Sequence, residues 1–253
     1  MQEIVSTSNQ LVKKIKSLKD KEARSLLDLF IVEGENIVKD IEKDVDVKYV
    51  FVEKNKISDF KYILDRYDES IIYSVSEAVM SAISDTKTPS GILVVVKPSK
   101  MDFVKGNNVV VLDGVSDPGN MGTIIRTCVA CGIKDIFAIN SVDAFSPKVV
   151  RSTMGGIFNV NVIPANYEDL DSKLMGYNLL TLDMNGQNIF SMKKIEKPFA
   201  LVVGSEAHGV SKYLKEKCST ILSLPMVGKI ESLNAAVSLS VALYELTFNL
   251  SID

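Results

Sequence analysis

The stretch Asn108–Thr127, NVVVLDGVSDPGNMGTIIRT, decides the fold, because an apolar run leads at once into a glycine-containing turn and a helical pattern. A continuous apolar run of this kind is typical of a strand that is buried on both faces of a parallel sheet. The apolar residues Ile124, Ile125 and Cys128 then recur at helical spacing. The stretch therefore predicts a strand, a turn and a helix that begins at about Met121.

The same alternation continues toward the C-terminus. Strands are expected at DIFAI (135–139), FNVNVI (158–163), NLLTLD (178–183), FALVVG (199–204) and TILSLP (220–225). Helices are expected near PKVVRST (147–153), YEDLDSKLM (167–175), SKYLKEK (211–217) and from about Leu233 to Asn249. Residues 107–253 are thus predicted to form a βα-alternating domain with a parallel sheet. Because such sheets bind ligands at the carboxyl ends of their strands, the loops after VVVLDG, LLTLD, ALVVG and ILSLP are where a site is expected.

The first 97 residues read as a separate, smaller α/β domain. Helices are expected at NQLVKKIKSLKDKEARSLLDLF (9–30), ENIVKDIEK (35–43) and EAVMSAIS (77–84), and strands at FIVEG (30–34), VKYVFVE (47–53), IIYSVS (71–76) and GILVVVKP (91–98). The pattern breaks over residues 98–106, which we interpret as a linker. A unit of this length lies in the usual range of domain sizes.

Composition excludes several classes of protein. The chain has 253 residues, of which 46% are hydrophobic, and no apolar run is long enough to span a bilayer, so no membrane partner is expected. Three cysteines and an N-terminus without a secretory pattern predict a reduced, cytoplasmic protein. The single histidine, His208, argues against a zinc centre, and no metal is expected. A net charge of -3 argues against unspecific coating of nucleic acid, although a local basic patch remains compatible with it.

The well-known catalytic and nucleotide-binding fingerprints are absent. The turn PGNMGTIIR is not the G-x-G-x-x-G of dinucleotide-binding folds, and no G-K-[ST] ends a phosphate-binding loop. No G-x-S-x-G element is present to carry a hydrolase nucleophile. The site chemistry must therefore come from other residues.

The turn itself suggests an anion site. Asn120 is expected to cap the helix, since asparagine is favoured at that position. Helical side chains lean toward the N-terminus, so Arg126 is expected to reach back over Gly122 toward Asn120. A guanidinium and an amide would then meet at a helix N-terminus, where anions are favoured. The alternative is an exposed arginine that pairs with a nearby acid, beside a capping asparagine.

Two further blocks lie after later strands. In VVGSEAHGV (202–210), Gly204 and Gly209 allow a tight turn with Glu206 between them, and the alternative is an ordinary glycine-rich connection with a capping carboxylate. In LSLPMVGKIESLNAAVSLSVALYEL (222–246), Ser232 and Asn234 stand at a helix start, where they could cap the helix or hold a ligand. The helix that follows is rich in alanine and serine, which let other segments pack closely against it.

Together these three blocks resemble the SpoU/TrmH-type RNA 2′-O-ribose methyltransferases of the SPOUT class. The family motif N-x-x-x-x-x-R, with a glycine two residues after the Asn, matches Asn120, Gly122 and Arg126. The motif G-x-E-x-x-G matches Gly204, Glu206 and Gly209. The apolar-Pro loop with S-L-N and a later Y-E matches Leu224, Pro225, Ser232, Leu233, Asn234, Tyr244 and Glu245. The matches cover the second domain in the family's order.

The resemblance implies a complete architecture. It is an α/β parallel-sheet SPOUT catalytic domain with a C-terminal trefoil knot, preceded by a small α/β RNA-binding domain similar to ribosomal-protein folds. Such a knot is a rare exception to the usual rules of chain connection. The resemblance also implies a homodimer with its site near the interface, and S-adenosylmethionine as the methyl donor. The residues implied to contact the donor are Gly204, Leu224, Met226 and Leu233.

The same resemblance makes Arg126 the catalytic residue. Since arginine stays protonated, we expect Arg126 to bind the RNA phosphate beside the target ribose and to orient the 2′-hydroxyl. Asn120 and Asn234 would position the hydroxyl or Arg126. Glu206 would orient Asn120 or Arg126, and Ser232 would support the cluster.

The expected partner is RNA, with ribosomal RNA favoured over tRNA by analogy. The lysines of the first helix, Lys13, Lys14 and Lys16, are candidates for RNA contact, and the alternative is a solvated helix face. Lys148 and Arg151 are candidates near the strand ends of the second domain. A non-catalytic RNA-binding protein that kept the fold is the alternative from another functional class.

Overall fold

The computed structural model describes residues 1–99, 102–230 and 232–250, and the chain divides into two compact units. The first unit comprises residues 1–100 together with 143–158, and the second comprises 101–142 together with 159–253. The segment 143–158 therefore differs from our expectation, which placed it in one continuous second domain. Phe145 of this segment packs on Phe30 with ring centroids 5.0 Å apart, and Asp143 forms an ion pair of 2.6 Å with the buried Arg24. These contacts fold the segment into the first unit.

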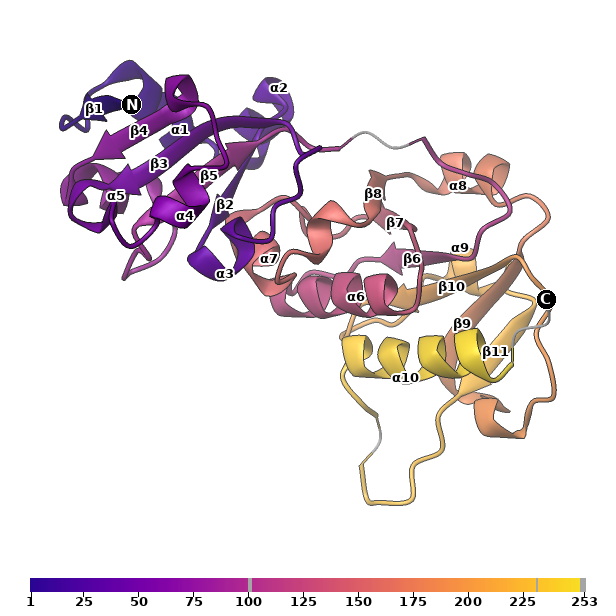
Figure 1. Cartoon of the computed structure of the whole chain (residues 1–253). Coiled ribbons are helices and arrows are strands. Elements are labelled where there is room, and N and C mark those ends of the chain that lie inside the picture. The colour runs from indigo at the N-terminus through magenta and orange to yellow at the C-terminus, as the bar shows by residue number, and fades with distance from the viewer. Residues whose placement is uncertain (100–101, 231, 251–253) are drawn as a thin grey trace. The chain divides into compact units, whose positions relative to one another are not determined.

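The described strands of the first unit form a mixed sheet with the order β1-β4-β3-β5-β2 (Figure 1). Its strands are β1 (Gln2–Ile4), β2 (Phe30–Glu33), β3 (Val47–Glu53), β4 (Ile72–Val75) and β5 (Ile92–Val96). Its helices are α1 (Gln10–Ser17), α2 (Lys21–Leu27), α3 (Glu35–Val38), α4 (Lys61–Leu64), α5 (Glu77–Ile83) and α7 (Pro147–Ser152), with 3-10 turns η1 (Lys54–Lys56), η2 (Glu69–Ile71) and η3 (Gly156–Phe158). Strand β5 runs antiparallel to both β2 and β3.

The single long helix that we expected over residues 9–30 is two helices. Asn9 caps α1 through its side chain, and the chain then turns before Asp20 opens α2. The expected spacing of Leu11, Ile15 and Leu18 is confirmed in part, because Ile15 and Leu18 are buried in the core whereas Leu11 is only partly buried. That core lies between α1, α5 and the sheet, with Phe51, Met80 and Leu93 among its members.

The second unit is built on a parallel sheet with the order β11-β9-β10-β6-β7-β8 in the described part of the chain. Its strands are β6 (Val109–Asp113), β7 (Asp135–Ile139), β8 (Asn161–Pro164), β9 (Asn178–Asn188), β10 (Phe199–Gly204) and β11 (Thr220–Ser223). Its helices are α6 (Pro118–Ala130), α8 (Tyr167–Lys173), α9 (Lys212–Lys215) and α10 (Ala235–Phe248), with the 3-10 turn η4 (Ile189–Ser191). The predicted parallel sheet is thus confirmed.

Helices α6 and α10 lie side by side on one face of this sheet (Figure 1). Thr127 and Ser240 share a hydrogen bond of 2.8 Å between their hydroxyls, and Ala236 and Ala242 are fully covered. The small side chains let the two helices approach closely. On the other face, the buried Leu170 of α8, Leu174 just after that helix and Leu214 of α9 pack in one core with Val109 and Val111 of β6.

The start of α6 differs from the predicted one. Asp117, not Asn120, caps the helix, and its carboxylate accepts the backbone N–H of Asn120 at 2.8 Å. Pro118 follows at the first helical position, where its missing N–H costs nothing. Because aspartate takes the capping role, the side chain of Asn120 is released for other contacts. Among the described residues, no helix is long and apolar enough to cross a membrane.

Candidate functional site

Two cavities lie at the carboxyl ends of β10 and β11, beside the middle of β9. The larger has a volume of about 640 Å³, and its lining includes Leu224 and Met226. The smaller has a volume of about 410 Å³, and its lining includes Gly204 and Glu206. Leu182, Ser232, Leu233 and Ser238 line both. The cavities are therefore neighbours, and they stand at the sheet edge where the sequence predicted a site.

A chain of hydrogen bonds joins the three sequence blocks at the smaller cavity. The Nδ2 of Asn120 donates to Oε1 of Glu206. The Oδ1 of Asn120 accepts from Nδ2 of Asn234 at 2.9 Å. In turn, Oδ1 of Asn234 accepts the backbone N–H groups of Ala236 and Val237, at 2.9 and 3.3 Å, as the N-cap of α10.

The orientation of both amide groups follows from the two ends of this chain. An ionised carboxylate can only accept, so the NH₂ group of Asn120 must face Glu206. The helix N–H groups can only donate, so the oxygen of Asn234 must face α10. The remaining oxygen of Asn120 and NH₂ group of Asn234 then meet as acceptor and donor. The network has one satisfied arrangement, which holds Asn120 in a single orientation.

The loop that carries Glu206 is tightly closed. Ser205 and Gly209 form an isolated antiparallel bridge, and the N–H of Gly209 donates to the carbonyl of Ser205 at 2.9 Å. A Cβ atom at Gly204 would lie 2.0 Å from the carbonyl carbon and oxygen of Gly209. Glycine is therefore required at the end of β10, because the loop folds back directly over it.

Arg126 stands apart from this network. It is exposed on α6, six residues after Asn120, or about 9 Å further along the helix axis. No hydrogen bond or ion pair joins its guanidinium to the described parts of the chain, so the alternative of a local acidic partner finds no support there. In the described parts of the chain no hydrogen bond joins Arg126 to Asn120, and their expected approach stays a prediction. The planar, permanently charged guanidinium of Arg126 is exposed on the surface of the protein.

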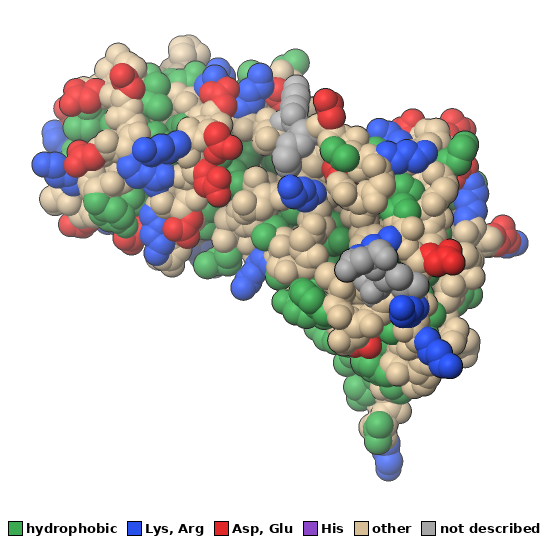
Figure 2. Space-filling view, turned by 45° about the vertical axis from the view of Figure 1, so that its right-hand side comes forward, with side chains coloured by type: hydrophobic (Ala, Val, Ile, Leu, Met, Phe, Trp, Pro, Cys, Tyr) green, Lys and Arg blue, Asp and Glu red, His purple; other side chains and the backbone are tan. Residues whose placement is uncertain are grey.

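The residues predicted to contact RNA fall into two groups. Lys13, Lys16 and Lys148 are exposed. The Nζ of Lys14 lies 5.5 Å from the ring centroid of Tyr49. The guanidinium of Arg151 lies 2.8 Å from a carboxylate oxygen of Asp85 and 3.8 Å from one of Glu33, within the first unit, and its contact with RNA stays a prediction. On the face drawn in Figure 2, basic and acidic side chains are interspersed rather than gathered in one patch.

Sequence reasoning missed two aspartates at the carboxyl edge of the sheet. Asp113, at the end of β6, is buried and accepts from the Tyr167 hydroxyl at 2.9 Å and from the Ser211 N–H at 2.8 Å. It thereby anchors the chain just after the Glu206 loop. Asp183, in β9, lines the larger cavity and forms an ion pair of 2.6 Å with Lys215. The available signal was a carboxylate that ends an apolar strand, in VVVLD and in LLTLD.

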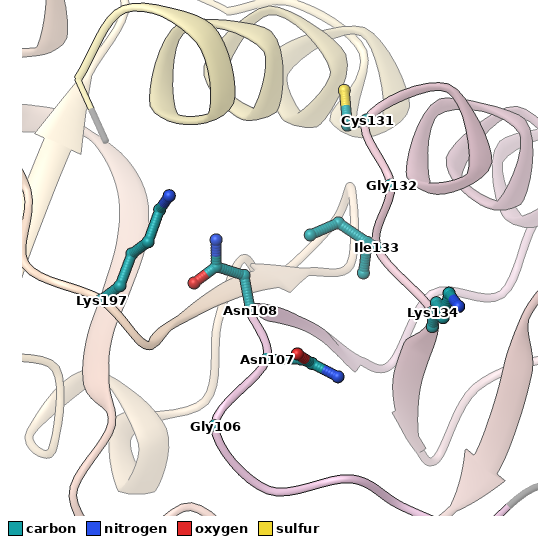
Figure 3. Close-up of a pocket in the computed structure, with 8 residues that line it drawn as sticks. All are labelled: Gly106, Asn107, Asn108, Cys131, Gly132, Ile133, Lys134 and Lys197. Atoms are coloured by element: carbon teal, nitrogen blue, oxygen red, sulfur yellow. The ribbon is translucent and has the colours of Figure 1, made fainter. Parts of the chain in front are cut away.

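A third cavity, of about 340 Å³, lies at the opposite edge of the sheet, where β6, β7 and β10 begin (Figure 3). Its lining consists of Gly106, Asn107, Asn108, Cys131, Gly132, Ile133, Lys134 and Lys197, none of which is a predicted site residue. Within the described ranges, no group of three or more His, Cys, Asp and Glu side chains could hold a metal ion.

Two family models match the chain. The model of the SpoU rRNA Methylase family matches residues 107–244, and that of the MRM3-like substrate binding domain matches residues 9–94. The first match covers more than half of the chain and contains every member of the Asn120–Glu206–Asn234 network.

Similar proteins are also found over the whole length. The chain is 32% identical, over 97% of its length and 99% of the relative, to the 23S rRNA (guanosine(2553)-2′-O)-methyltransferase RlmP of Bacillus subtilis. It is 34% identical, over 61% of its length and 60% of the relative, to the 23S rRNA (adenosine(1067)-2′-O)-methyltransferase of Streptomyces azureus. The crystal structure of an AdoMet-bound rRNA methyltransferase from Sinorhizobium meliloti has a TM-score of 0.83 and 27% identity, with 97% of each chain covered. The resemblance expected from the sequence is confirmed, and the chain belongs to the SpoU rRNA methylase family.

Proposed function

We propose that this protein transfers a methyl group from S-adenosylmethionine to a ribose 2′-hydroxyl of ribosomal RNA. The observation that carries the proposal is the Asn120–Glu206–Asn234 network beside the two cavities. Its member Asn120 lies on the same helix as Arg126, which is exposed and has no partner among the described residues. The names of the two curated relatives support ribosomal RNA as the substrate. The first unit would supply part of the RNA contact, in agreement with the substrate-binding domain that it matches.

The two neighbouring cavities fit the methyl donor. Their linings are apolar for the most part, with serine hydroxyls and backbone groups between, which suits a flat purine base joined to a polar tail. Gly204, Leu224, Met226 and Leu233 would hold the donor, and Gly204 leaves its backbone open to close approach. When bound, S-adenosylmethionine supplies a methyl group that is electrophilic because it is attached to a sulfonium.

The residues of this chain would then position the nucleophile. A ribose hydroxyl is weakly nucleophilic and must be oriented and deprotonated. Arg126 stays protonated, so we assign it to the RNA phosphate beside the target ribose, with the hydroxyl proton leaving through that phosphate. Orientation alone supplies up to about 7–11 kcal/mol in well-aligned reactions.

Asn120 would position the acceptor ribose while Arg126 binds the neighbouring phosphate. Its side chain is fixed between Glu206 and Asn234 and cannot rotate without the loss of two hydrogen bonds. Ser232 lines both cavities and would support the same arrangement. Asn120, Glu206, Asn234 and Ser232 are positioning residues in this scheme.

A second copy of the chain would cover α10. Val237, Val241, Tyr244 and Phe248 are exposed at a spacing of three and four residues, so they form one apolar stripe. On the opposite face of α10, the side chains of Ala236, Leu239 and Leu243 are buried. A helix that is apolar on all sides is normally buried on all sides, which supports the expected homodimer. We also retain the C-terminal trefoil knot and the cytoplasmic location, where ribosomal RNA is found, as parts of the proposal.

Among the predicted RNA contacts, we retain Lys13, Lys16 and Lys148, which are exposed. Lys14 would contribute with its ammonium group partly held by Tyr49. Arg151 would instead stabilise the first unit, because it already forms ion pairs with two carboxylates there.

Mapping of 2′-O-methyl groups on ribosomal RNA and tRNA, from cells with and without the active protein, tests the proposal. We expect one ribosomal RNA nucleotide to lose its methyl group when Arg126 is replaced. Loss from tRNA alone would establish the tRNA alternative. No lost methyl group, and no thermal stabilisation by S-adenosylmethionine, would favour the non-catalytic RNA-binding alternative, since a ligand that binds the native state must stabilise it.

A further inference from the structure

The larger cavity contains one charged group among its described lining residues. Leu182, Leu222, Leu224 and Leu233 make most of the wall, and Ser223, Ser232 and Ser238 add hydroxyls. Asp183 is the carboxylate, and its side chain is 26% exposed. Burying an ionised group against an apolar wall costs free energy unless its oxygens find donors. Asp183 therefore needs hydrogen-bond donors, both from the protein and from a ligand that fills the cavity.

The protein supplies one donor to each oxygen of this carboxylate. The Nζ of Lys215 lies 2.6 Å from Oδ2, and the backbone N–H of Asn185 donates to Oδ1 at 3.0 Å. An ionised carboxylate offers about four acceptor positions. Each oxygen thus keeps capacity for another donor, and Asp183 lines the cavity from which such donors could come.

Charge limits which donors suit these positions. Lys215 already neutralises the carboxylate, and the hydrogen bonds from Lys215 and then from Asn185 lower the pKa of Asp183, which keeps it ionised at neutral pH. A cationic donor such as an ammonium group would add a second positive charge beside Lys215. A neutral pair of hydroxyl groups adds none, and vicinal hydroxyls are spaced to meet two oxygens of one carboxylate.

We infer that Asp183 binds the two ribose hydroxyls of the methyl donor, and that Lys215 is the positioning residue that holds the carboxylate in place. This inference rests on the proposed function, since it assigns a subsite for the nucleoside part of S-adenosylmethionine. It places the ribose at the end of the apolar part of β9, with the base toward the leucine-rich wall. Specificity for a ribonucleoside over a deoxynucleoside would then come from one carboxylate.

Isothermal titration calorimetry tests the inference with two probes, S-adenosylhomocysteine and its 2′,3′-dideoxy derivative. Calorimetry is suitable because the chain contains no tryptophan to report binding by fluorescence. The wild-type protein should bind the dideoxy probe at least about tenfold more weakly, as expected when hydrogen bonds to a charged group are lost. Asp183→Asn should bind both probes equally, near the affinity of the wild-type protein for the dideoxy probe.

Asp171→Asn is the matched control, because Asp171 also pairs with a lysine near α9, Lys217, yet does not line the cavity. It should keep the wild-type preference for the ribonucleoside. Lys215→Met keeps Asp183 but removes its ion pair. This variant should lose part of the preference for the ribonucleoside probe. It provides a second measurement if Asp183→Asn does not fold.

Two results would overturn the inference while leaving the proposed function intact. One is a wild-type preference in Asp183→Asn. The other is an equal loss of affinity for both probes, which would assign the carboxylate to another part of the ligand, such as the adenine amino group. A wild-type protein that binds neither probe nor S-adenosylmethionine would refute the proposed function, and this inference with it.

Discussion

Asn234 donates a hydrogen bond of 2.9 Å to Asn120, although 114 positions separate the two residues in the chain. The bond joins the N-cap of α10 to the first turn of α6, and Glu206 completes it from the loop after β10. Three segments that are far apart in the sequence therefore share one polar network. Its single satisfied arrangement makes specific demands on each member.

Replacement of Asn120 by aspartate should disrupt this network through charge. Asn120→Asp replaces the hydrogen-bond donor that faces Glu206 by a carboxylate, so two negative charges repel each other there. We expect methyl transfer to fall at least about tenfold, because the network loses a hydrogen bond to a charged group and gains a repulsion. In the double variant Asn120→Asp/Glu206→Gln, the new amide at position 206 can donate to the new carboxylate at position 120, which restores a hydrogen bond between the two side chains. The activity of the double variant should exceed that of the single variant. Equal activity of the single and double variants would contradict the arrangement.

Replacement of Arg126 by lysine should separate donor binding from chemistry. Arg126→Lys keeps the charge but loses the planar fork that binds phosphate. We expect the affinity for S-adenosylmethionine to stay within about twofold and methyl transfer to fall at least about 100-fold, a loss of about 2.7 kcal/mol. Lys134→Met, which removes a charge at the opposite edge of the sheet (Figure 3), should keep its activity. Wild-type turnover in Arg126→Lys would refute the role assigned to the guanidinium.

Replacement of Gly204 by alanine should remove donor binding for a steric reason. The new Cβ would lie 2.0 Å from atoms of Gly209, so the closed Glu206 loop must shift. We expect a lower melting temperature and no detectable thermal stabilisation by S-adenosylmethionine. Gly228→Ala is the control, because nothing lies within 4 Å of its Cβ position. If both variants bound the donor like the wild-type protein, the loop would not form part of the donor site.

Replacement of Val241 by glutamate should produce a monomer. Val241 lies in the middle of the exposed stripe of α10, where a buried charge would oppose association. We expect light scattering to report half the mass of the wild-type particle. Leu26→Glu changes an apolar residue that is 85% exposed on α2 and should leave the mass unchanged. A dimer that persists in Val241→Glu would place the interface elsewhere.

Lys148 and Arg151 should respond differently to the same change, although they lie on one helix. Lys148→Gln should weaken RNA binding and reduce the salt dependence of binding by about one phosphate contact. Arg151→Gln leaves the buried Glu33 without its cation and should destabilise the protein by about 1–3 kcal/mol, measured by urea unfolding. The reverse pattern, with a stable Arg151→Gln that binds RNA poorly, would return Arg151 to direct RNA contact.

The sequence was a sufficient guide wherever the signal is local. Strand β3 has the predicted bounds, because its seven residues are rich in β-branched and aromatic side chains, which favour a strand. The long helix predicted over residues 9–30 divides in two, since the spacing of Leu11, Ile15 and Leu18 does not show where a turn interrupts the pattern. Helix α9 spans Lys212–Lys215 and is shorter than the predicted 211–217, because the sequence pattern also does not show where this helix ends.

Competition between side chains was beyond the reach of the sequence. Asp117 and Asn120 are both good helix caps, and only the folded turn decides that Asp117 takes the position. Arg151 has the composition of an RNA contact, yet the packing of α7 on the first unit brings Asp85 and Glu33 to it. Neither outcome can be read from spacing, because the competing partners lie far away in the chain.

The sequence by itself determined the parallel sheet of the second unit, the order of its three site blocks and the family to which they belong. Hydrophobic periodicity and turn chemistry act over a few residues, so they are written in the chain. Only the tertiary structure decided that Asn120 bridges Glu206 and Asn234, that Arg126 has no partner in the described part of the chain, and that Asp183 lines the larger cavity. These relationships depend on which strand ends become neighbours, and a sheet whose order is β11-β9-β10-β6-β7-β8 brings them together from distant parts of the sequence.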